Sequence, residues 1–242
     1  MGRELDLARE IQMGLLPAAP LIVGLWETVG HIIPARSIGG DAFDYFAHGE
    51  GRFSIEIADV SGKGVPAALL MSNVQASLRA FCDGRRPLPE AIRHVNQSVT
   101  RTATAGKFIT LFYGEIESAP GRLRYVNAGH NYPMLRRSGG KIEELREGGT
   151  PLGIFEGAEY EQGEVSFQNG DTLLLYSDGI TEALDSAGME FGEERLRALW
   201  RDHGARPPVE VLGAVLEDLT SFRGAAGQSD DMTLVVVGAR GD

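Results

Sequence analysis

Four aspartates stand where the sequence predicts strand ends, and together they have the chemistry of a metal site. Asp59 and Asp178 each follow a predicted strand and precede a glycine-bearing turn. Asp41 and Asp230 each open a predicted strand. In an antiparallel sheet the start of one strand lies beside the end of its neighbour, so all four carboxylates can reach one rim. The sequence therefore predicts an acidic site at one edge of the fold.

The chemistry of such a rim follows from the cost of gathering negative charge. Two carboxylates about 4 Å apart repel by about 4 kcal/mol at an effective dielectric constant near 20. Several such pairs require either protonation or cations between them. Oxygen ligands alone favour Mg²⁺ or Mn²⁺ over zinc, and paired ions of this kind commonly hydrolyse phosphate esters. The alternative stays open here, because an aspartate beside glycine is also a common turn former.

The elements that must position these aspartates alternate between groups of strands and groups of helices. Apolar periodicity predicts helices over 3–16, 66–81, 89–102, 193–203 and 208–222, and strands over 25–33, 42–47, 52–58, 108–116, 123–127, 133–137, 172–176 and 233–237. The first three strands are close enough in sequence to form a meander, and the next three have hairpin spacing. The looser segment 148–170 is a candidate flap, with an ordinary surface loop as the alternative. This order predicts an α+β layered domain with mainly antiparallel sheets.

Composition and charge narrow the class of protein. The chain has 242 residues and a formal net charge of −11 at pH 7, so we expect no nucleic acid partner. The single cysteine, Cys82, excludes an internal disulfide and a multi-cysteine zinc site. No apolar stretch approaches the roughly 20 residues that cross a bilayer, and no apolar signal core follows Met1. We therefore expect a cytoplasmic protein with no membrane span.

Six short motifs occur in a fixed order along nearly the whole chain. They are Gly39-Gly40-Asp41, Ala58-Asp59-Val60-Ser61-Gly62-Lys63-Gly64, Asn127-Ala128-Gly129-His130-Asn131, Pro151-Leu152-Gly153, Tyr176-Ser177-Asp178-Gly179 and Asp230-Asp231-Met232-Thr233. This set resembles the metal-dependent protein phosphatases of the 2C type (PPM). Within that family it is most similar to the bacterial branch of stage II sporulation and sigma-factor regulator phosphatases.

The resemblance implies both a fold and a ligand set. The fold would be a four-layer αββα sandwich of two mainly antiparallel sheets flanked by helices, with two Mn²⁺ or Mg²⁺ ions at one end. By match, Asp59 would bridge both ions, and the backbone carbonyl of Val60 would bind one of them. Asp178 and Asp230 would hold the first ion. Asp41 would act mainly on the second.

Other matched residues are expected beside the ligands rather than among them. These are Asp231, Gly40 and His130, and a histidine in a Gly-His-Asn turn is expected to be structural rather than an acid or base. Eukaryotic relatives carry a histidine inside the motif that matches 59–64, and this chain has none there, which leaves the general acid unassigned. They also carry an upstream arginine that grips phosphate, and Arg36 lies near its place.

The activity implied by the resemblance is that of a protein serine/threonine phosphatase. Metal-activated water would attack phosphoserine or phosphothreonine directly, with no phosphoenzyme. The substrate would be a phosphorylated anti-anti-sigma protein of the STAS type in a partner-switching pathway. The alternative is a non-catalytic module of the same fold that holds a signalling partner, against which the four aspartates argue. A metal-dependent phosphodiesterase acting on nucleotides fits the carboxylates, but no nucleotide-reading motif supports it.

The N-terminal helix is expected to be separate in role from the rest. Residues 1–20 resemble the linker helix that joins such phosphatases to upstream sensor domains, and residues 21–242 would form the phosphatase domain. Ile11 and Leu15 lie in its narrow apolar stripe. Such a stripe suits packing on the phosphatase core, pairing in a homodimer, or switching between the two. A plain first core helix is the alternative.

Overall fold

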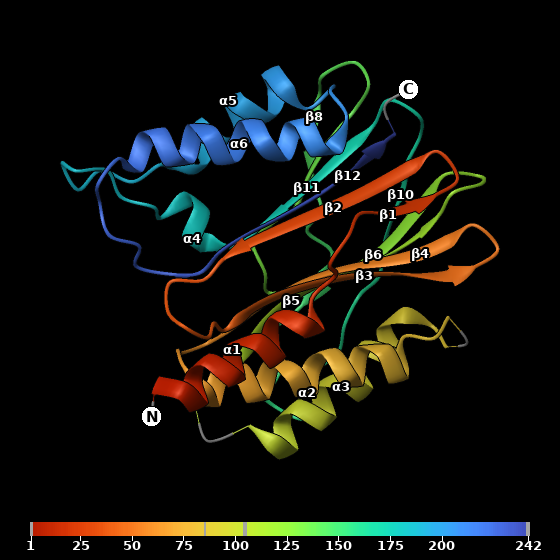
Figure 1. The fold of residues 1–242 in the computed structure, drawn as a ribbon. Coiled ribbons are helices and arrows are strands. Elements are labelled where there is room, and N and C mark those ends of the chain that lie inside the picture. Colours follow the sequence, from red (N-terminus) through yellow and green to blue (C-terminus); the bar gives the residue numbers. More distant parts are fainter. Residues whose placement is uncertain (1, 85, 104–105, 241–242) are drawn as a thin grey trace.

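The strands around the four aspartates pair into two sheets that pack face to face, with helices on both outer sides (Figure 1). The computed structural model describes residues 2–84, 86–103 and 106–240. Helices α1, α2 and α3 cover one sheet, and α4, α5 and α6 lie against the other (Figure 1). The fold class predicted from the sequence, a four-layer αββα sandwich, is therefore confirmed.

The first sheet holds both early and late segments of the chain. Its order is β1-β2-β12-β11-β7-β8, and all of its pairs are antiparallel. The strands are β1 (Leu21–Val23), β2 (Trp26–Ile33), β12 (Met232–Ala239), β11 (Thr172–Tyr176), β7 (Met134–Arg136) and β8 (Ile142–Glu144). The central strands β11 and β12 are buried on both faces, which explains their continuous apolar runs.

The second sheet is an antiparallel meander extended at one edge. Its order is β10-β6-β5-β4-β3, and the short β9 pairs with β6 in parallel. The strands are β3 (Asp41–Gly49), β4 (Arg52–Val60), β5 (Ile109–Glu117), β6 (Arg122–Ala128), β9 (Gly148–Gly149) and β10 (Gly163–Ser166). Because β9 and β10 both pair with β6, the two ends of the candidate flap are anchored to this sheet.

Helices close the outer faces. They are α1 (Gly2–Leu15), α2 (Val65–Phe81), α3 (Leu88–Thr102), the short α4 (Asp178–Thr181), α5 (Glu193–His203) and α6 (Pro208–Arg223). Pro66 lies in the first turn of α2, where a missing N–H costs nothing. Within the described ranges, none of the helices combines the length and the apolar character that a bilayer crossing requires.

Three apolar layers hold the sandwich together. The layer between the sheets is aromatic, and Trp26 stacks on Phe167 with ring centroids 4.3 Å apart. Gly30 is required there, because a Cβ atom at this position would collide with the ring of Phe43. The outer layers pack α2 and α3 on the second sheet, and α5 and α6 on the first. Both sheets are thereby fixed relative to each other at the rim that carries the aspartates.

Two of the pairings expected from sequence spacing are wrong. The first three predicted strands do not form one meander, because β2 pairs with β1 and β12 while β3 and β4 belong to the other sheet. Likewise β6 and β7 lie in different sheets. Both errors have one cause: spacing reports which strands are neighbours in sequence, whereas inward-facing apolar side chains decide which sheet a strand joins.

Candidate functional site

Asp41 and Asp59 face each other across two neighbouring strands of the second sheet. They are directly opposed in the antiparallel ladder of β3 and β4, at the end of the sheet where β3 begins. Asp41 is buried, and its Oδ2 accepts a 2.6 Å hydrogen bond from Oγ1 of Thr233. Since Thr233 belongs to β12 of the first sheet, this bond joins the two sheets at the rim.

Asp178 and Asp230 come to the same rim from the first sheet. Asp178 directly follows Ser177 at the end of β11 and opens α4, and Asp230 lies just before β12. The strands β11 and β12 are antiparallel neighbours, so the end of one meets the start of the other. The peptide N–H of Ser177 donates to the carbonyl of Thr233 at 3.0 Å and ties these two ends together. The structure thus brings all four predicted aspartates to one rim, two from each sheet.

The electrostatics of the rim show that ionisation is costly for three of these carboxylates. Burial, followed by the charge of Asp59, holds the pKa of Asp41 well above its usual range. Burial and the neighbouring Asp178 raise the pKa of Asp59 to about 6. Burial and Asp230 raise the pKa of Asp178 as well. A bound cation would relieve each of these costs, because it favours the ionised carboxylates.

The oxygen atoms at this rim are of the type that binds hard divalent ions, although the carboxylate side chains do not converge on one point. Across residues 2–84, 86–103 and 106–240, no three His, Cys, Asp or Glu side chains are grouped closely enough to hold a metal ion by themselves. A backbone carbonyl oxygen lies close to these carboxylates. A Cβ atom at Gly40 would lie 3.0 Å from the carbonyl oxygen of Val60 and 3.5 Å from Oδ1 of Asp59, so glycine keeps both oxygens accessible. All of these donors are oxygens, which suits Mg²⁺ or Mn²⁺.

Lys63 forms an ion pair with one of the four aspartates, Asp230. Its Nζ lies 2.7 Å from Oδ2 of Asp230 and donates a second bond, also 2.7 Å, to the carbonyl of Ser229. The lysine is exposed, yet its ammonium group is engaged by both of these oxygens. It holds the carboxylate that the family resemblance assigns to the first ion.

Asp231 holds the loop that carries Asp41. Its carboxylate accepts backbone hydrogen bonds from Ala35 at 2.8 Å, Gly40 at 2.7 Å and Asp41 at 3.4 Å. Gly39 lies so close to the same carboxylate that a Cβ atom would collide with it. Asp231 therefore positions the Gly-Gly-Asp segment, and its oxygens are already engaged by peptide N–H groups.

His130 is buried and both of its ring nitrogens are occupied. Nε2 lies 3.2 Å from the carbonyl of Tyr176, which can only accept, so Nε2 carries the proton. Nδ1 then accepts from the hydroxyl of Thr110 at 2.8 Å. Burial lowers the pKa of His130 to about 4, which keeps the ring neutral. These contacts give His130 a structural place between β5 and β11.

Three residues that touch the rim were not singled out from the sequence. Thr233 reaches Asp41, Lys107 donates to the carbonyl of Ser61 at 2.7 Å, and Gln12 bonds to Gly39. Only Thr233 carried a signal, because it lies within the matched Asp-Asp-Met-Thr motif. Arg36, considered as a phosphate ligand, lies exposed in the segment between β2 and β3.

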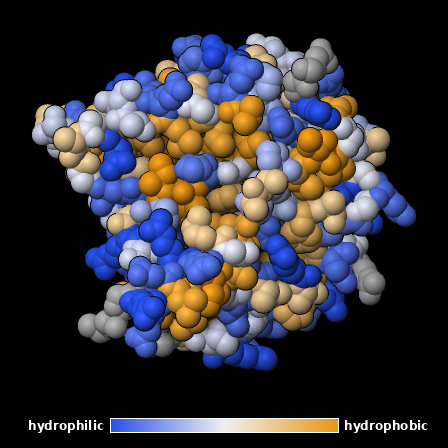
Figure 2. All heavy atoms as spheres, viewed as in Figure 1, coloured by the Kyte–Doolittle hydropathy of each residue, from blue (hydrophilic) through white to orange (hydrophobic). Residues whose placement is uncertain are grey.

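The N-terminal helix contacts the site through Gln12. The side-chain amide donates to the carbonyl of Gly39 at 2.9 Å and accepts from its N–H at 3.1 Å. Ile11 and Leu15 remain 61% and 41% exposed. Hydrophobic residues are visible on the surface where α1 lies across α2 (Figure 2). The helix is thus docked by a polar contact while its apolar stripe stays largely open.

This architecture is that of the PP2C-type phosphatases. The structure superposes on the SiaA-PP2C domain of Pseudomonas aeruginosa with a TM-score of 0.84 at 23% identity, covering 100% of this chain and 96% of that one. The sequence profile of the family Stage II sporulation protein E (SpoIIE) matches residues 49–240, and the chain belongs to that family.

Curated relatives extend the likeness over nearly the whole chain. Phosphoserine phosphatase RsbP of Bacillus subtilis is 29% identical over 97% of this chain and 57% of its own length. Protein IcfG of Synechocystis is 29% identical over 97% of this chain and 41% of its own length. The chain therefore spans about half the length of these relatives.

Proposed function

We propose that this chain is a Mn²⁺- or Mg²⁺-dependent protein serine/threonine phosphatase. The observation that supports it most directly is the rim of four aspartates, drawn in pairs from both sheets, in which the pKa values of Asp41, Asp59 and Asp178 are raised. The family relationship, and a relative named as a phosphoserine phosphatase, support the same activity.

Each residue of the rim has a proposed part. Asp59 would be shared between two ions, with the carbonyl of Val60 as a further ligand. Asp178 and Asp230 would hold the first ion, and Asp41 would act on the second. Divalent ions at such a site supply charge neutralisation on the phosphoryl oxygens and promote the ionisation of water.

The protein's own groups restrict the remaining chemistry. Cys82 is buried at the C-terminal end of α2, and burial raises the pKa of its thiol, so it is no nucleophile for a phosphoenzyme. His130 is neutral and its Nε2 proton is committed to Tyr176, which makes it a poor donor to a leaving group. We therefore propose that water attacks phosphorus directly and that water also protonates the departing serine oxygen.

The proposed substrate is a phosphorylated anti-anti-sigma protein of the STAS type in a partner-switching pathway, which would place the activity in the cytoplasm. This rests on the resemblance to sigma-factor regulator phosphatases. We further propose that residues 1–20 act as a linker or regulatory helix for the phosphatase domain of residues 21–242, connecting it to an upstream sensor domain or to a second copy.

The test is release of phosphate from a phosphorylated STAS-type protein with Mn²⁺, with Mg²⁺ and with a chelator. Asp59→Asn is the matched variant, because it keeps the side-chain volume and removes the charge. We expect metal-dependent release that the substitution lowers by at least about 100-fold, beyond the usual 10- to 100-fold cost of losing a mere outer-shell partner. Binding of the phosphoprotein without any release would instead favour the non-catalytic module.

A further inference from the structure

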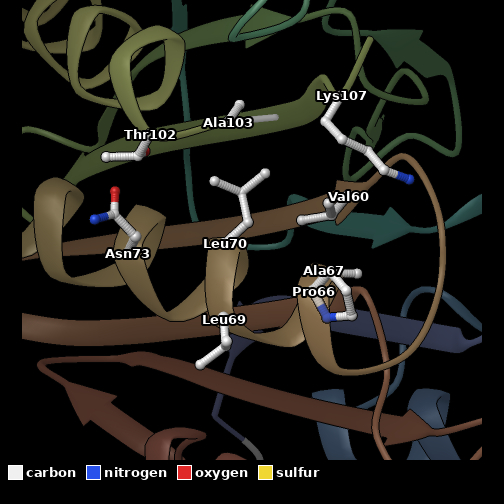
Figure 3. Close-up of a pocket in the computed structure, with 9 residues that line it drawn as sticks. All are labelled: Val60, Pro66, Ala67, Leu69, Leu70, Asn73, Thr102, Ala103 and Lys107. Carbon is white, nitrogen blue, oxygen red and sulfur yellow. The ribbon is translucent and has the colours of Figure 1, made fainter. Parts of the chain in front are cut away.

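A small apolar cavity opens beside the aspartate rim. It measures about 290 Å³ and lies between the first turns of α2 and the residues Thr102, Ala103 and Lys107 (Figure 3). Pro66, Ala67 and Leu70 form one wall, and Ala103 and Lys107 lie opposite (Figure 3). Ligand pockets for small molecules usually hold about 300–1,000 Å³. This cavity is at the lower end of that range, so it suits one amino-acid side chain better than a cofactor.

The cavity and the rim share a residue. The side chain of Val60 lines the cavity (Figure 3). Its carbonyl oxygen and Oδ1 of Asp59 both lie beside Gly40 at the rim. An extended peptide advances about 3.3–3.6 Å per residue. A peptide whose phosphorylated residue lies at Asp59 would therefore reach the cavity within about three residues.

The lip of the cavity is apolar and exposed. Leu69 is 67% exposed and Val65 is 42% exposed, both in the first turns of α2. Phe108, next to Lys107, is 39% exposed. Leu69 lines the cavity itself, whereas Val65 and Phe108 are next in sequence to the lining residues Pro66 and Lys107. Single exposed apolar residues are ordinary, but an exposed leucine in the wall of an apolar cavity suits contact with an apolar side chain.

One lysine, Lys107, lines the cavity, and another, Lys63, pairs with Asp230 of the rim. Lys107 Nζ donates to the carbonyl of Ser61 at 2.7 Å and lies against Gly62, and Lys63 reaches Asp230 from the same loop. In a chain with a net charge of −11, this places positive charge where a phosphate group would approach. The surface therefore complements a segment that is anionic at one residue and apolar a few residues away.

We propose that this cavity is the subsite that binds one bulky apolar side chain of the phosphoprotein substrate, within three residues of the phosphorylated serine or threonine. The inference rests on the proposed phosphatase function and specifies what that site selects. Side-chain burial at the cavity would select among phosphoproteins, while the rim acts on the phosphate common to all of them.

The test uses synthetic phosphoserine peptides of otherwise polar sequence, with a single leucine moved from three residues before the phosphoserine to three residues after it. We expect one position to raise kcat/KM by at least about tenfold over the all-polar peptide, the lower end of what burying a leucine gives. Ala103→Phe fills the cavity and Leu69→Gln removes its lip. Both should abolish that preference while leaving hydrolysis of an aryl phosphate unchanged.

The matched control is Val209→Gln, which changes an apolar residue, 54% exposed, on α6 at the other side of the sandwich. It should keep the preference. Equal kcat/KM for all peptides, or a preference that survives Ala103→Phe and Leu69→Gln, would overturn the subsite.

Binding of the same peptides, labelled and measured by fluorescence anisotropy, separates this inference from the activity. If no variant hydrolyses any substrate but the leucine preference in binding persists and depends on Ala103, the subsite stands and the phosphatase function is rejected. If hydrolysis is metal-dependent but indifferent to leucine, the function stands and the subsite is rejected.

Discussion

The Nζ atom of Lys63 lies 2.7 Å from Oδ2 of Asp230, so the ammonium group forms an ion pair with a carboxylate that we propose binds metal. Both side chains are more than a third exposed, and an exposed pair of this kind is worth roughly 0.2–1 kcal/mol. Lys63→Met frees the carboxylate for the ion. We expect it to tighten Mn²⁺ binding by up to about fivefold, measured by calorimetry.

Lys141→Met is the control for that comparison. Lys141 is exposed and pairs with Glu143 of β8, in a different part of the molecule. It should leave the affinity for Mn²⁺ unchanged. Weaker binding in Lys63→Met would mean that the lysine assists the ion rather than competes with it.

The pKa of Asp59 predicts how stability depends on pH without metal. Its value of about 6 in the folded protein exceeds about 3.9 in an unfolded chain. The folded state therefore holds this proton more tightly, and the stability it contributes is lost as pH rises from about 4 through 6. In chelator, we expect Asp59→Asn to melt above the wild type at pH 7 and to lose that advantage toward pH 4.

Addition of Mn²⁺ at pH 7 provides the complementary measurement. The ion should raise the melting temperature of the wild type, because it binds only the folded state, and should raise that of Asp59→Asn much less. An Asn variant that melts below the wild type at pH 7 in chelator would show that the carboxylate is not under electrostatic strain.

His130 should matter for stability rather than for turnover. Its pKa is lowered to about 4 in the folded protein, against about 6.5 in an unfolded chain. The folded state resists protonation, so His130 makes the protein lose stability as pH falls from about 6.5 toward 4. His130→Ala should lower the free energy of unfolding at pH 7 by about 1–3 kcal/mol through the lost hydrogen bonds, and should flatten this acid dependence.

Kinetics of the same variant test its catalytic role. We expect phosphoserine and aryl phosphate substrates to be hydrolysed at nearly wild-type rates. A loss of about 100-fold or more on phosphoserine alone, within the usual range for acid catalysis, would identify His130 as the general acid.

Polar substitution on the open stripe of α1 separates regulation from core packing. Ile11→Gln and Leu15→Gln change residues that are already 61% and 41% exposed, so the free energy of unfolding should change by no more than about 0.5 kcal/mol. If α1 is a regulatory helix, activity or dimerisation, followed by light scattering, should change more than the melting temperature. A drop in stability alone would make α1 a plain first core helix.

We expect α1 to contribute to metal binding through the contact of Gln12 with Gly39. Gln12→Ala removes both bonds to Gly39, next to the Gly40-Asp41 segment at the rim. Two partly buried hydrogen bonds are together worth about 1–3 kcal/mol, so we expect weaker Mn²⁺ binding by about threefold or more. Ile11→Ala, one residue away and pointing elsewhere, serves as the control, and equal affinity in both variants would contradict the coupling.

Local patterns in the sequence located most elements, but not their partners. Apolar periodicity placed α2, α3 and β4 to within one or two residues, because burial of one face is visible in the residues themselves. It also placed β2, but not its partner, because Thr28 pairs with Val237 from the far end of the chain. Strands as short as β9, and the single turn of α4, carry too few residues for any period.

The same distinction holds for the site. The four aspartates were found because each lies at a strand end that the sequence already marks. The contacts of Gln12 with Gly39 and of Thr233 with Asp41 join residues 27 and 192 positions apart, and no local pattern contains them. Whether the aspartates bind two ions stays a prediction.

The division of the rim between two sheets has a kinetic consequence. Neither sheet alone carries more than two of the four aspartates, so an ion held as we propose would gain its full set of ligands only after the sheets have docked. Interactions that form after the folding transition state slow unfolding without accelerating folding. Bound metal should therefore slow unfolding and lengthen the lifetime of the native state. Refolding from denaturant should proceed at the rate measured without metal.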